Sequence, residues 1–229
     1  MYINKLLTKV NYNKKNDINR IKYIVVHYVG STGDAEANCK YFEKLYRGSS
    51  AHYFVGHKGD IWQCVEDANV AWHCGAIKYK HKECRNSNSI GVEMCVKMKN
   101  GKWYFEEATV ASTLALVKEL MKKYNVPAAN VIRHYDVTGK SCPEPYVRDA
   151  AAWDKFKASL TNTVSAPTGS YKVRVTANKL NVRIGASINY NIVTVVKKGE
   201  VYTIVEEKDG WGKLKSGAGW IKLSYTERV

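Results

Sequence analysis

A stretch of small and polar residues, Thr161–Ser170, divides the chain into two parts with different apolar patterns. It contains one proline and one glycine and has no apolar period, as is typical of an interdomain linker. Apolar residues before it occur at both strand and helix spacing, whereas short strand-like segments follow it. A length of 229 residues accommodates one medium and one small domain. We therefore predict a first domain over residues 1–160, a linker over 161–170 and a second domain over 171–229.

The first part mixes strand and helix patterns. A dense apolar run at 21–28 predicts a buried central strand, since such strands are covered on both faces. Further strands are predicted at 52–55, 61–65 and 89–96. Apolar residues three and four apart predict helices at 35–47, 106–124 and 149–160. The expected fold is α/β, with a mixed central β-sheet flanked by helices.

The second part contains short predicted strands separated by turn residues. The strands are expected at 171–175, 180–182, 193–196, 201–205, 211–214 and 219–221. This pattern predicts a small all-β barrel. Trp211, Trp220, Tyr190 and Tyr225 are candidates for its core or for a binding groove, and we favour the core for the two tryptophans.

Two histidines and one cysteine of the first part have the chemistry of a metal site. His134 and Cys142 are eight residues apart around a turn, with Lys140 two residues before the thiol, and His27 ends the apolar run Ile24-Val25-Val26. Two imidazoles and one thiolate form the ligand set of a catalytic zinc whose fourth position stays open for water. If these three side chains meet in space, the protein is a hydrolase.

Glu93 is a carboxylate inside an apolar strand pattern. Burying a carboxylate without a purpose is costly, so we expect a chemical role for it. Strand alternation also allows it to face outward, as an ordinary surface residue.

A second set of metal-binding side chains competes with the first. His73, Cys74, His81 and Cys84 lie within twelve residues and are an alternative structural zinc site, although they lack a paired Cys-x-x-Cys spacing. The six cysteines form no tight disulfide framework, and in a reducing cytosol we expect most of them to be free thiols. Whether Cys74 and Cys84 pair or bind metal stays open at this point.

The net charge of +15 favours a polyanionic partner such as nucleic acid, an anionic membrane or an anionic cell wall. Nucleic acid is not expected, because no basic helix, zinc-finger spacing or RNA-binding aromatic signature occurs. Membrane insertion is not expected either, because no run approaches the roughly 20 apolar residues of a membrane span. The N-terminus lacks the pattern of a signal peptide, so we expect synthesis in the cytoplasm.

Five separated blocks of the first part together resemble one known family. They are Val25-Val26-His27-Tyr28, Ser50-Ala51-His52-Tyr53-Phe54-Val55, Ala71-Trp72-His73, Asn88-Ser89-Ile90-Gly91-Val92-Glu93 and the segment from His134 to Pro143. In this order they resemble the zinc-dependent N-acetylmuramoyl-L-alanine amidases of type 2, the family of the peptidoglycan recognition proteins. The resemblance covers residues 20–160.

The second part resembles bacterial SH3 (SH3b) domains, through Leu180–Ser187, Gly210-Trp211 and Gly219-Trp220-Ile221. Domains of that family bind cell-wall material. An amidase followed by such a domain is similar to a phage or prophage endolysin, which acts on the peptidoglycan of a Gram-positive cell wall after release from the cytoplasm.

The resemblance also implies roles for individual residues. It implies His27, His134 and Cys142 as Zn²⁺ ligands, Glu93 as the carboxylate that moves the water proton, and Lys140 as the cation that stabilises the oxyanion. His52 stands where a relative has a catalytic tyrosine. The predicted substrate contacts are His52, Tyr53, Trp72, His73 and Asn88.

Three other functions fit the sequence. The chain could be a peptidoglycan receptor without catalysis, although such relatives typically lack the cysteine ligand. Cys142 could instead be a nucleophile paired with His134, as in cysteine peptidases that carry SH3b domains. The second domain could bind a protein rather than the wall.

Overall fold

The computed structural model of the protein describes residues 2–161, 170–208 and 210–229. It divides into two compact units, one formed by Ile3–Thr161 and the other containing the C-terminal part of the chain. The predicted linker lies outside the described residues except for Thr161, which ends a helix, and Ser170. The exact domain limits therefore stay a prediction, and each unit is described by itself.

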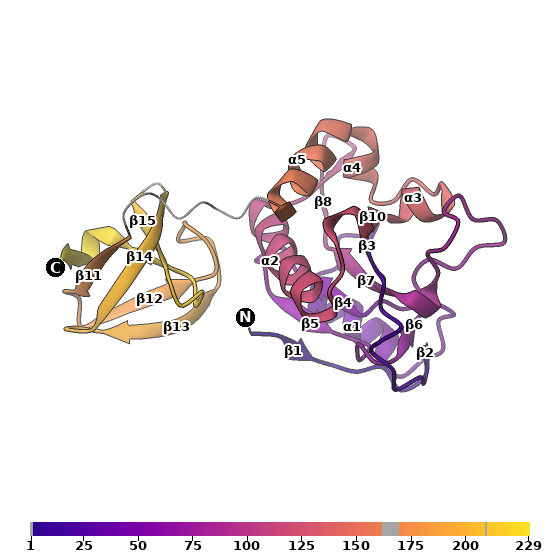
Figure 1. Cartoon of the computed structure of the whole chain (residues 1–229), viewed down its shortest axis with the longest axis horizontal. Helices are drawn as coiled ribbons and strands as arrows, with labels where there is room; N and C mark the ends of the chain where they lie inside the picture. Colours follow the sequence, from indigo (N-terminus) through magenta and orange to yellow (C-terminus); the bar gives the residue numbers. More distant parts are fainter. Residues whose placement is uncertain (1, 162–169, 209) are drawn as a thin grey trace. The chain divides into compact units, whose positions relative to one another are not determined.

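The described part of the first unit is built on a six-stranded mixed sheet in the order β1-β5-β4-β7-β3-β10 (Figure 1). Its strands are β1 (Asn4–Lys5), β3 (Tyr23–Tyr28), β4 (Tyr53–Val55), β5 (Ile61–Gln63), β7 (Ser89–Met94) and β10 (Val131–Arg133). Strands β4, β7, β3 and β10 are parallel, whereas β5 pairs antiparallel with β4. The mixed α/β architecture predicted from the sequence is confirmed.

Short strands that the apolar pattern did not predict complete this unit. They are β1 and β10 in the central sheet, the pair β2 (Tyr12–Asn13) and β6 (Val70–Ala71), and the hairpin of β8 (Lys97–Lys99) and β9 (Lys102–Tyr104). Each has two or three residues, which is too short to show a period in the sequence.

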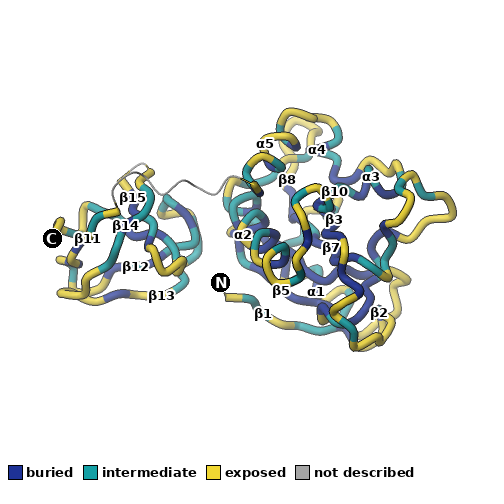
Figure 2. Tube along the Cα trace, viewed as in Figure 1, coloured by how far each residue is buried: buried dark blue, intermediate teal, exposed yellow. Residues whose placement is uncertain are grey.

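Side chains alternate between the two faces of the central strands and thereby separate the core from the polar residues. Ile24 and Val26 of β3 belong to the main apolar core, whereas His27 lies on the opposite face. Strands β3 and β7 pair with His27 opposite Glu93, so Glu93 shares the face of His27. Figure 2 shows that both strands run through the buried interior of the unit. The sheet therefore places these two polar side chains next to each other.

Helices cover the sheet. They are α1 (Ala35–Glu43), α2 (Glu107–Tyr124), α3 (His134–Thr138), α4 (Glu144–Arg148) and α5 (Ala150–Thr161). Helix α2 packs against β3, β4 and β7 and contacts α5, while α1 packs against β4 and β5. Asn125 caps α2, and its left-handed backbone (φ 51°) turns the chain so that the N–H of Val126 donates back to the carbonyl of Met121. None of the helices in the described residues is both long enough and apolar enough to cross a bilayer.

Helix α1 ends four residues before the predicted limit at Arg47, and a tertiary contact explains the difference. The side-chain amide of Asn11 donates to the carbonyls of Phe42 and Leu45, and its oxygen accepts from the N–H of Arg47. Asn11 thus satisfies backbone groups that would otherwise continue the helix. A contact between residues more than thirty positions apart cannot be read from the helix pattern.

The second unit is a seven-stranded antiparallel sheet in the described residues, in the order β13-β12-β16-β15-β14-β11-β17. Its strands are β11 (Tyr171–Val175), β12 (Lys179–Arg183), β13 (Ile192–Lys197), β14 (Val201–Lys208), β15 (Trp211–Leu214), β16 (Trp220–Lys222) and β17 (Thr226–Arg228). All six predicted strands are present, and β17 is additional. Trp211 and Trp220 are buried, as favoured from the sequence, while Tyr225 is half exposed.

Candidate active site

His27, His134 and Cys142 come from three segments of the first unit and meet at one point. Their ligand atoms all lie within 4.8 Å of one another, and His27 Nδ1 is 3.7 Å from Cys142 Sγ. All three side chains are buried. The two imidazole rings contact each other edge to face, with centroids 4.7 Å apart.

The parallel sheet and one tight loop produce this arrangement. Strand β10 pairs with β3, with Arg133 opposite Val26, so that His134 at the start of α3 lies beside His27 at the carboxyl ends of the strands. Gly139 ends α3 in a left-handed conformation (φ 86°) and turns the chain back. The N–H of Tyr135 donates to the carbonyl of Cys142 (2.7 Å), which closes the loop and places the thiol beside the imidazoles.

Glu93 faces the same point from β7. Its Oε1 is 3.9 Å from His27 Nδ1, and 18% of its side chain is exposed. Its Oε2 is buried and has no hydrogen-bond partner among the described residues. Burial raises the pKa of Glu93 to about 8, although the nearby charge of Lys140 acts in the opposite direction. An unpartnered buried carboxylate oxygen indicates a missing ligand or water.

The protonation states of the three side chains fit a metal ion. Burial, with a contribution from Lys140, lowers the pKa of His134 to about 4, and burial lowers the pKa of His27 well below its ordinary value. Both imidazoles are therefore neutral near pH 7, as metal ligands must be. Burial and Glu93 raise the pKa of the Cys142 thiol to about 12, whereas a bound divalent ion deprotonates a coordinating thiol. Two neutral imidazoles, one thiol and a carboxylate oxygen without a partner suit zinc.

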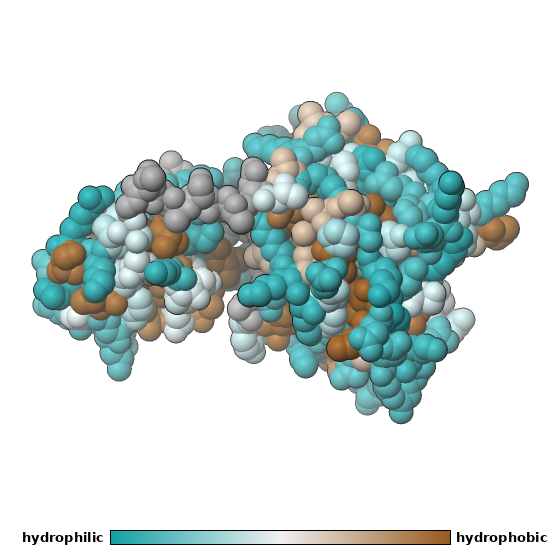
Figure 3. Space-filling view, in the orientation of Figure 1, coloured by the Kyte–Doolittle hydropathy of each residue, from teal (hydrophilic) through white to brown (hydrophobic). Residues whose placement is uncertain are grey.

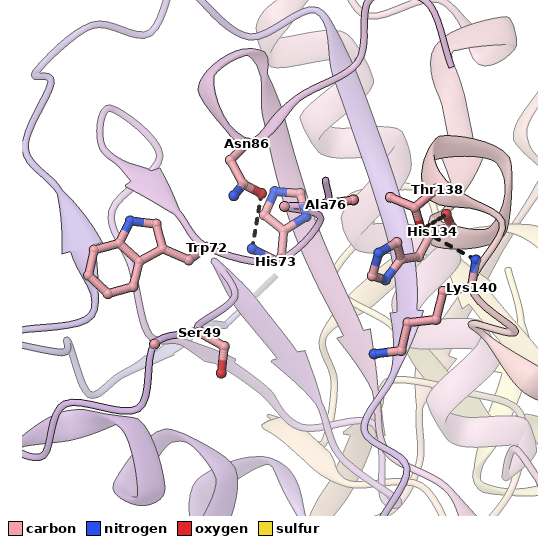
Figure 4. A pocket seen from close by; sticks show the side chains of 10 residues that line it. Ser49, Trp72, His73, Ala76, Asn86, His134, Thr138 and Lys140 are labelled. Carbon is pink, nitrogen blue, oxygen red and sulfur yellow. Dashed lines mark hydrogen bonds between the residues drawn. The ribbon is translucent and has the colours of Figure 1, made fainter. Parts of the chain in front are cut away.

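Two adjoining cavities of about 630 and 720 Å³ open onto this cluster. Both are lined by Trp72, His73, His134 and Lys140, and the first also reaches Glu93 and Cys142. Figure 4 shows Lys140 and His134 on one side of the second cavity and Trp72 and Ser49 on the other. Two of the predicted substrate contacts, Trp72 and His73, therefore lie in the cavity wall, where a bound molecule can touch them.

His52 and Tyr53, also predicted to contact substrate, lie elsewhere. His52 is fully buried: its Nδ1 accepts from the N–H of Gly91 (3.0 Å), and its Nε2 lies 3.1 Å from the carbonyl oxygen of Asn69. Tyr53 points to the opposite face of the sheet, where its hydroxyl donates to Asp67 (2.5 Å). The side chains of His52 and Tyr53 therefore both form hydrogen bonds inside the fold. Strand alternation and burial determine where they point. The prediction that they contact substrate does not agree with this placement.

Asn88, the fifth predicted substrate contact, holds a local turn. Its oxygen accepts from the N–H of Arg85 (2.8 Å), and its amide donates to the carbonyl of Glu83 (3.1 Å). Asn86 lines the cavity instead, and its side-chain oxygen accepts from the N–H groups of His73 and Cys74. Asn86 and Asn88 are only two positions apart, and nothing in the sequence shows which of them holds the turn and which lines the cavity.

The sequence patterns also missed the wall of the first cavity that α1 and the preceding loop provide. This wall includes Val29, Gly30, Ser31, Gly33, Ala37, Asn38, Tyr41 and Phe42. The helix was predicted, but its position over the carboxyl end of the sheet depends on tertiary packing with β4 and β5.

The alternative zinc set does not converge in the structure. Within the described residues, His27, His134 and Cys142 are the group of side chains close enough to share an ion. His81 Nδ1 accepts from the N–H groups of Glu83 and Cys84, and both ring nitrogens of His73 lie within hydrogen-bond distance of other side chains. Cys74 and Cys84 are buried free thiols.

Comparisons with known proteins agree with this site. A family model described as N-acetylmuramoyl-L-alanine amidase matches residues 17–145, and a bacterial SH3 domain model matches residues 178–227. The amidase CwlL of Bacillus licheniformis is 34% identical over 165 residues, covering 66% of this chain and 45% of CwlL. A probable N-acetylmuramoyl-L-alanine amidase of the same organism is 33% identical over 168 residues, covering 69% of this chain and 46% of that protein.

The chain thus spans about half the length of these curated relatives. A solved structure described as a mutant endolysin from Bacillus subtilis matches with a TM-score of 0.56 and 29% identity, over 70% of this chain and 99% of the other. The family match covers the strands and loops that carry His27, Glu93, His134 and Cys142. On this evidence, the chain belongs to the N-acetylmuramoyl-L-alanine amidase family.

Proposed function

We propose that the protein is a zinc-dependent peptidoglycan hydrolase that cleaves the amide bond between N-acetylmuramic acid and L-alanine. The observation that carries this proposal is the convergence of two imidazoles and one thiol beside a buried carboxylate oxygen without a partner, in the wall of an open cavity. The activity in the names of its relatives is the same amide hydrolysis.

Each residue of the site has a distinct task in this reaction. A zinc ion bound by His27, His134 and Cys142 would supply a water of lowered pKa and a positive charge for the substrate carbonyl. Glu93 is placed to take the proton of the attacking water and to deliver it to the leaving nitrogen, for which a pKa near neutrality is suited. The ammonium of Lys140, in the cavity wall, is placed to stabilise the negative charge that develops on the carbonyl oxygen.

A cysteine nucleophile is the less favoured enzyme mechanism. The thiolate is the reactive form of cysteine, and the pKa of about 12 keeps the Cys142 thiol protonated near pH 7. Catalytic cysteines lie in electropositive, partly exposed surroundings, whereas Cys142 is buried beside the carboxylate of Glu93. The presence of Cys142 also disfavours the receptor without catalysis.

The wall of a Gram-positive bacterium is the proposed substrate, and the second unit is proposed to bind that wall. The bacterial SH3 match and the Bacillus relatives support this assignment. The net charge of +15 favours attraction to anionic wall polymers, and Figure 3 shows hydrophilic residues spread widely over this face. We further propose that the protein is made in the cytoplasm and acts on the wall after release.

The direct test is mass spectrometry of the fragments released from purified Gram-positive peptidoglycan. We expect free peptide stems with an L-alanine N-terminus and intact glycan strands. EDTA should abolish their release, added zinc should restore it, and iodoacetamide applied to the zinc-loaded protein should have little effect. Release that survives EDTA and stops with iodoacetamide would support the cysteine peptidase, and binding without any release would support the receptor.

A further inference from the structure

His73 connects His27 to the backbone through a continuous series of hydrogen bonds. His27 Nε2 lies 3.0 Å from His73 Nδ1, and His73 Nε2 lies 3.2 Å from Ser89 Oγ. The hydroxyl of Ser89 in turn lies 2.6 Å from the backbone oxygen of Arg85. All three side chains are buried. The series therefore begins at a candidate metal ligand, His27, and ends at a carbonyl oxygen, which can only accept a hydrogen bond.

The short contact with this carbonyl sets the direction of the series, because Ser89 Oγ lies 2.6 Å from the oxygen of Arg85 and 4.0 Å from Cys74 Sγ, its other possible partner. A carbonyl oxygen only accepts, so the hydroxyl of Ser89 donates to Arg85 and accepts from His73 Nε2–H. A neutral His73 that carries its proton on Nε2 has a lone pair on Nδ1, which accepts from His27 Nε2–H. A neutral His27 with its proton on Nε2 then directs the Nδ1 lone pair toward Cys142 Sγ, 3.7 Å away.

The surroundings of His73 are shaped to hold its ring in this place. A Cβ at Gly91 would lie 2.5 Å from His73 Cγ, so glycine is the residue that leaves room for the ring on β7. The N–H of His73 donates to the side-chain oxygen of Asn86, as the dashed line in Figure 4 shows. The rings of His27 and His73 are perpendicular, with centroids 5.1 Å apart.

We propose that His73 is a positioning residue that holds His27 in the Nε2–H form, so that Nδ1 is the metal-binding atom, with Ser89 fixing the direction of the series. This inference rests on the proposed zinc site but not on the proposed substrate. The hydrogen bond from a ligating histidine to a second partner fixes its orientation, and loss of such a partner typically weakens metal binding about 10- to 100-fold.

The protonated nitrogen of His27 can be measured directly in the zinc-free protein. Long-range ¹H–¹⁵N NMR spectra at neutral pH should show both His27 and His73 as Nε2–H forms. In the Ser89→Ala variant, His73 should become a mixture of its two forms, because the hydroxyl that selects one of them is gone. A wild-type His27 that carries its proton on Nδ1 would overturn the inference, whatever the protein hydrolyses.

Zinc affinity, measured by competition with a chelator, provides the second test. We expect His73→Phe to weaken zinc binding about 10- to 100-fold. His73→Asn should recover most of this loss, because its side-chain oxygen provides an acceptor close to the position of Nδ1. His81→Asn is the matched control and should bind zinc as the wild type does, since His81 Nδ1 accepts from its own loop and the ring contacts Tyr23.

Two outcomes separate the inference from the proposed function. If the wild type binds zinc through His27 but His73→Phe binds it equally well, the positioning role is wrong and the zinc site stands. If zinc does not bind to the wild type, the proposed function fails, and the NMR spectra still decide the orientation of His27. In the cobalt-substituted protein, the absorption spectrum should change in His73→Phe and stay the same in His81→Asn. A merely structural role of His73 would leave the spectrum unchanged in both variants.

Discussion

Asp67 and Glu93, two carboxylates of the first unit, have opposite surroundings. The oxygens of Asp67 accept hydrogen bonds from Tyr53, Gln63, Lys123 and Tyr124, so both of them are satisfied. One oxygen of Glu93 has no hydrogen-bond partner, and the other is 3.9 Å from His27 Nδ1.

Their pKa values move in opposite directions as a result. Burial alone would raise the pKa of Asp67, but hydrogen bonds from Tyr124, Tyr53 and Lys123 together lower it. Burial raises the pKa of Glu93 to about 8 because Lys140 only partly opposes it. A buried carboxylate with a complete set of partners stabilises the fold, whereas one without partners points to a ligand that the protein binds.

Removing Cys142, a proposed zinc ligand, should have the largest effect on the site that contains Glu93. We expect Cys142→Ala to weaken zinc binding by more than the roughly 100-fold that loss of a supporting partner costs, and to bring peptidoglycan hydrolysis to background. Cys39→Ala, which removes another buried thiol, is the control and should keep zinc and activity. Metal analysis and the release of peptide stems are the measurements, and an active, zinc-loaded Cys142→Ala protein would exclude the proposed site.

Glu93→Gln tests whether the unsatisfied carboxylate is chemical rather than structural. The amide keeps the size of the side chain but cannot take a proton, so turnover should fall about 10²- to 10⁴-fold. Zinc should remain bound, because Glu93 is not among the three convergent ligands. Turnover equal to that of the wild type, measured with zinc fully loaded, would remove the proton-transfer role.

Lys140→Ala should have a smaller effect on the same reaction. Loss of one group that stabilises the oxyanion costs about 10²-fold in turnover, while zinc stays bound. Lys78→Ala removes an exposed lysine and is the matched control. If both variants lose the same activity, the effect comes from general charge and not from the position of Lys140.

Asp67→Asn tests the other side of the comparison and should change stability rather than chemistry. Weakening its hydrogen bonds should cost about 1–3 kcal/mol of unfolding free energy, with turnover unchanged while the protein is folded. Because folding lowers the pKa of Asp67, its stabilisation is present above the ordinary aspartate pKa and is lost as the pH falls through the lowered value.

Denaturant unfolding at several pH values measures this difference. The wild type should lose its advantage over Asp67→Asn under acidic conditions. If the difference in unfolding free energy between the wild type and Asp67→Asn stays constant down to the lowest pH, the carboxylate is not the source of the stability.

Much of the site could be predicted from the sequence because its residues lie at the ends of recognisable segments. His27 ends an apolar strand, and His134, Lys140 and Cys142 lie in one short segment, so their types and spacing already indicated a zinc ligand set and a lysine. Glu93 was identified from the cost of burying it, and the sheet register then placed it opposite His27.

The remaining features depend on contacts that the sequence does not display. Tyr53 was predicted to contact substrate, and only the sheet shows that its side chain points to Asp67. Asn88 was predicted to contact substrate, but its side chain holds a turn, and only the fold shows that Asn86 lines the cavity. The link from His27 through His73 to Ser89 joins three separate segments and emerged only from their packing.

X-ray absorption spectroscopy of the zinc-loaded protein at the zinc edge reads the ligand set directly. With His27, His134 and Cys142 as ligands, we expect one sulfur scatterer at about 2.3 Å and two imidazole nitrogens at about 2.0–2.1 Å. A spectrum with no sulfur, or with the two sulfurs that a site at Cys74 and Cys84 would give, would contradict the account.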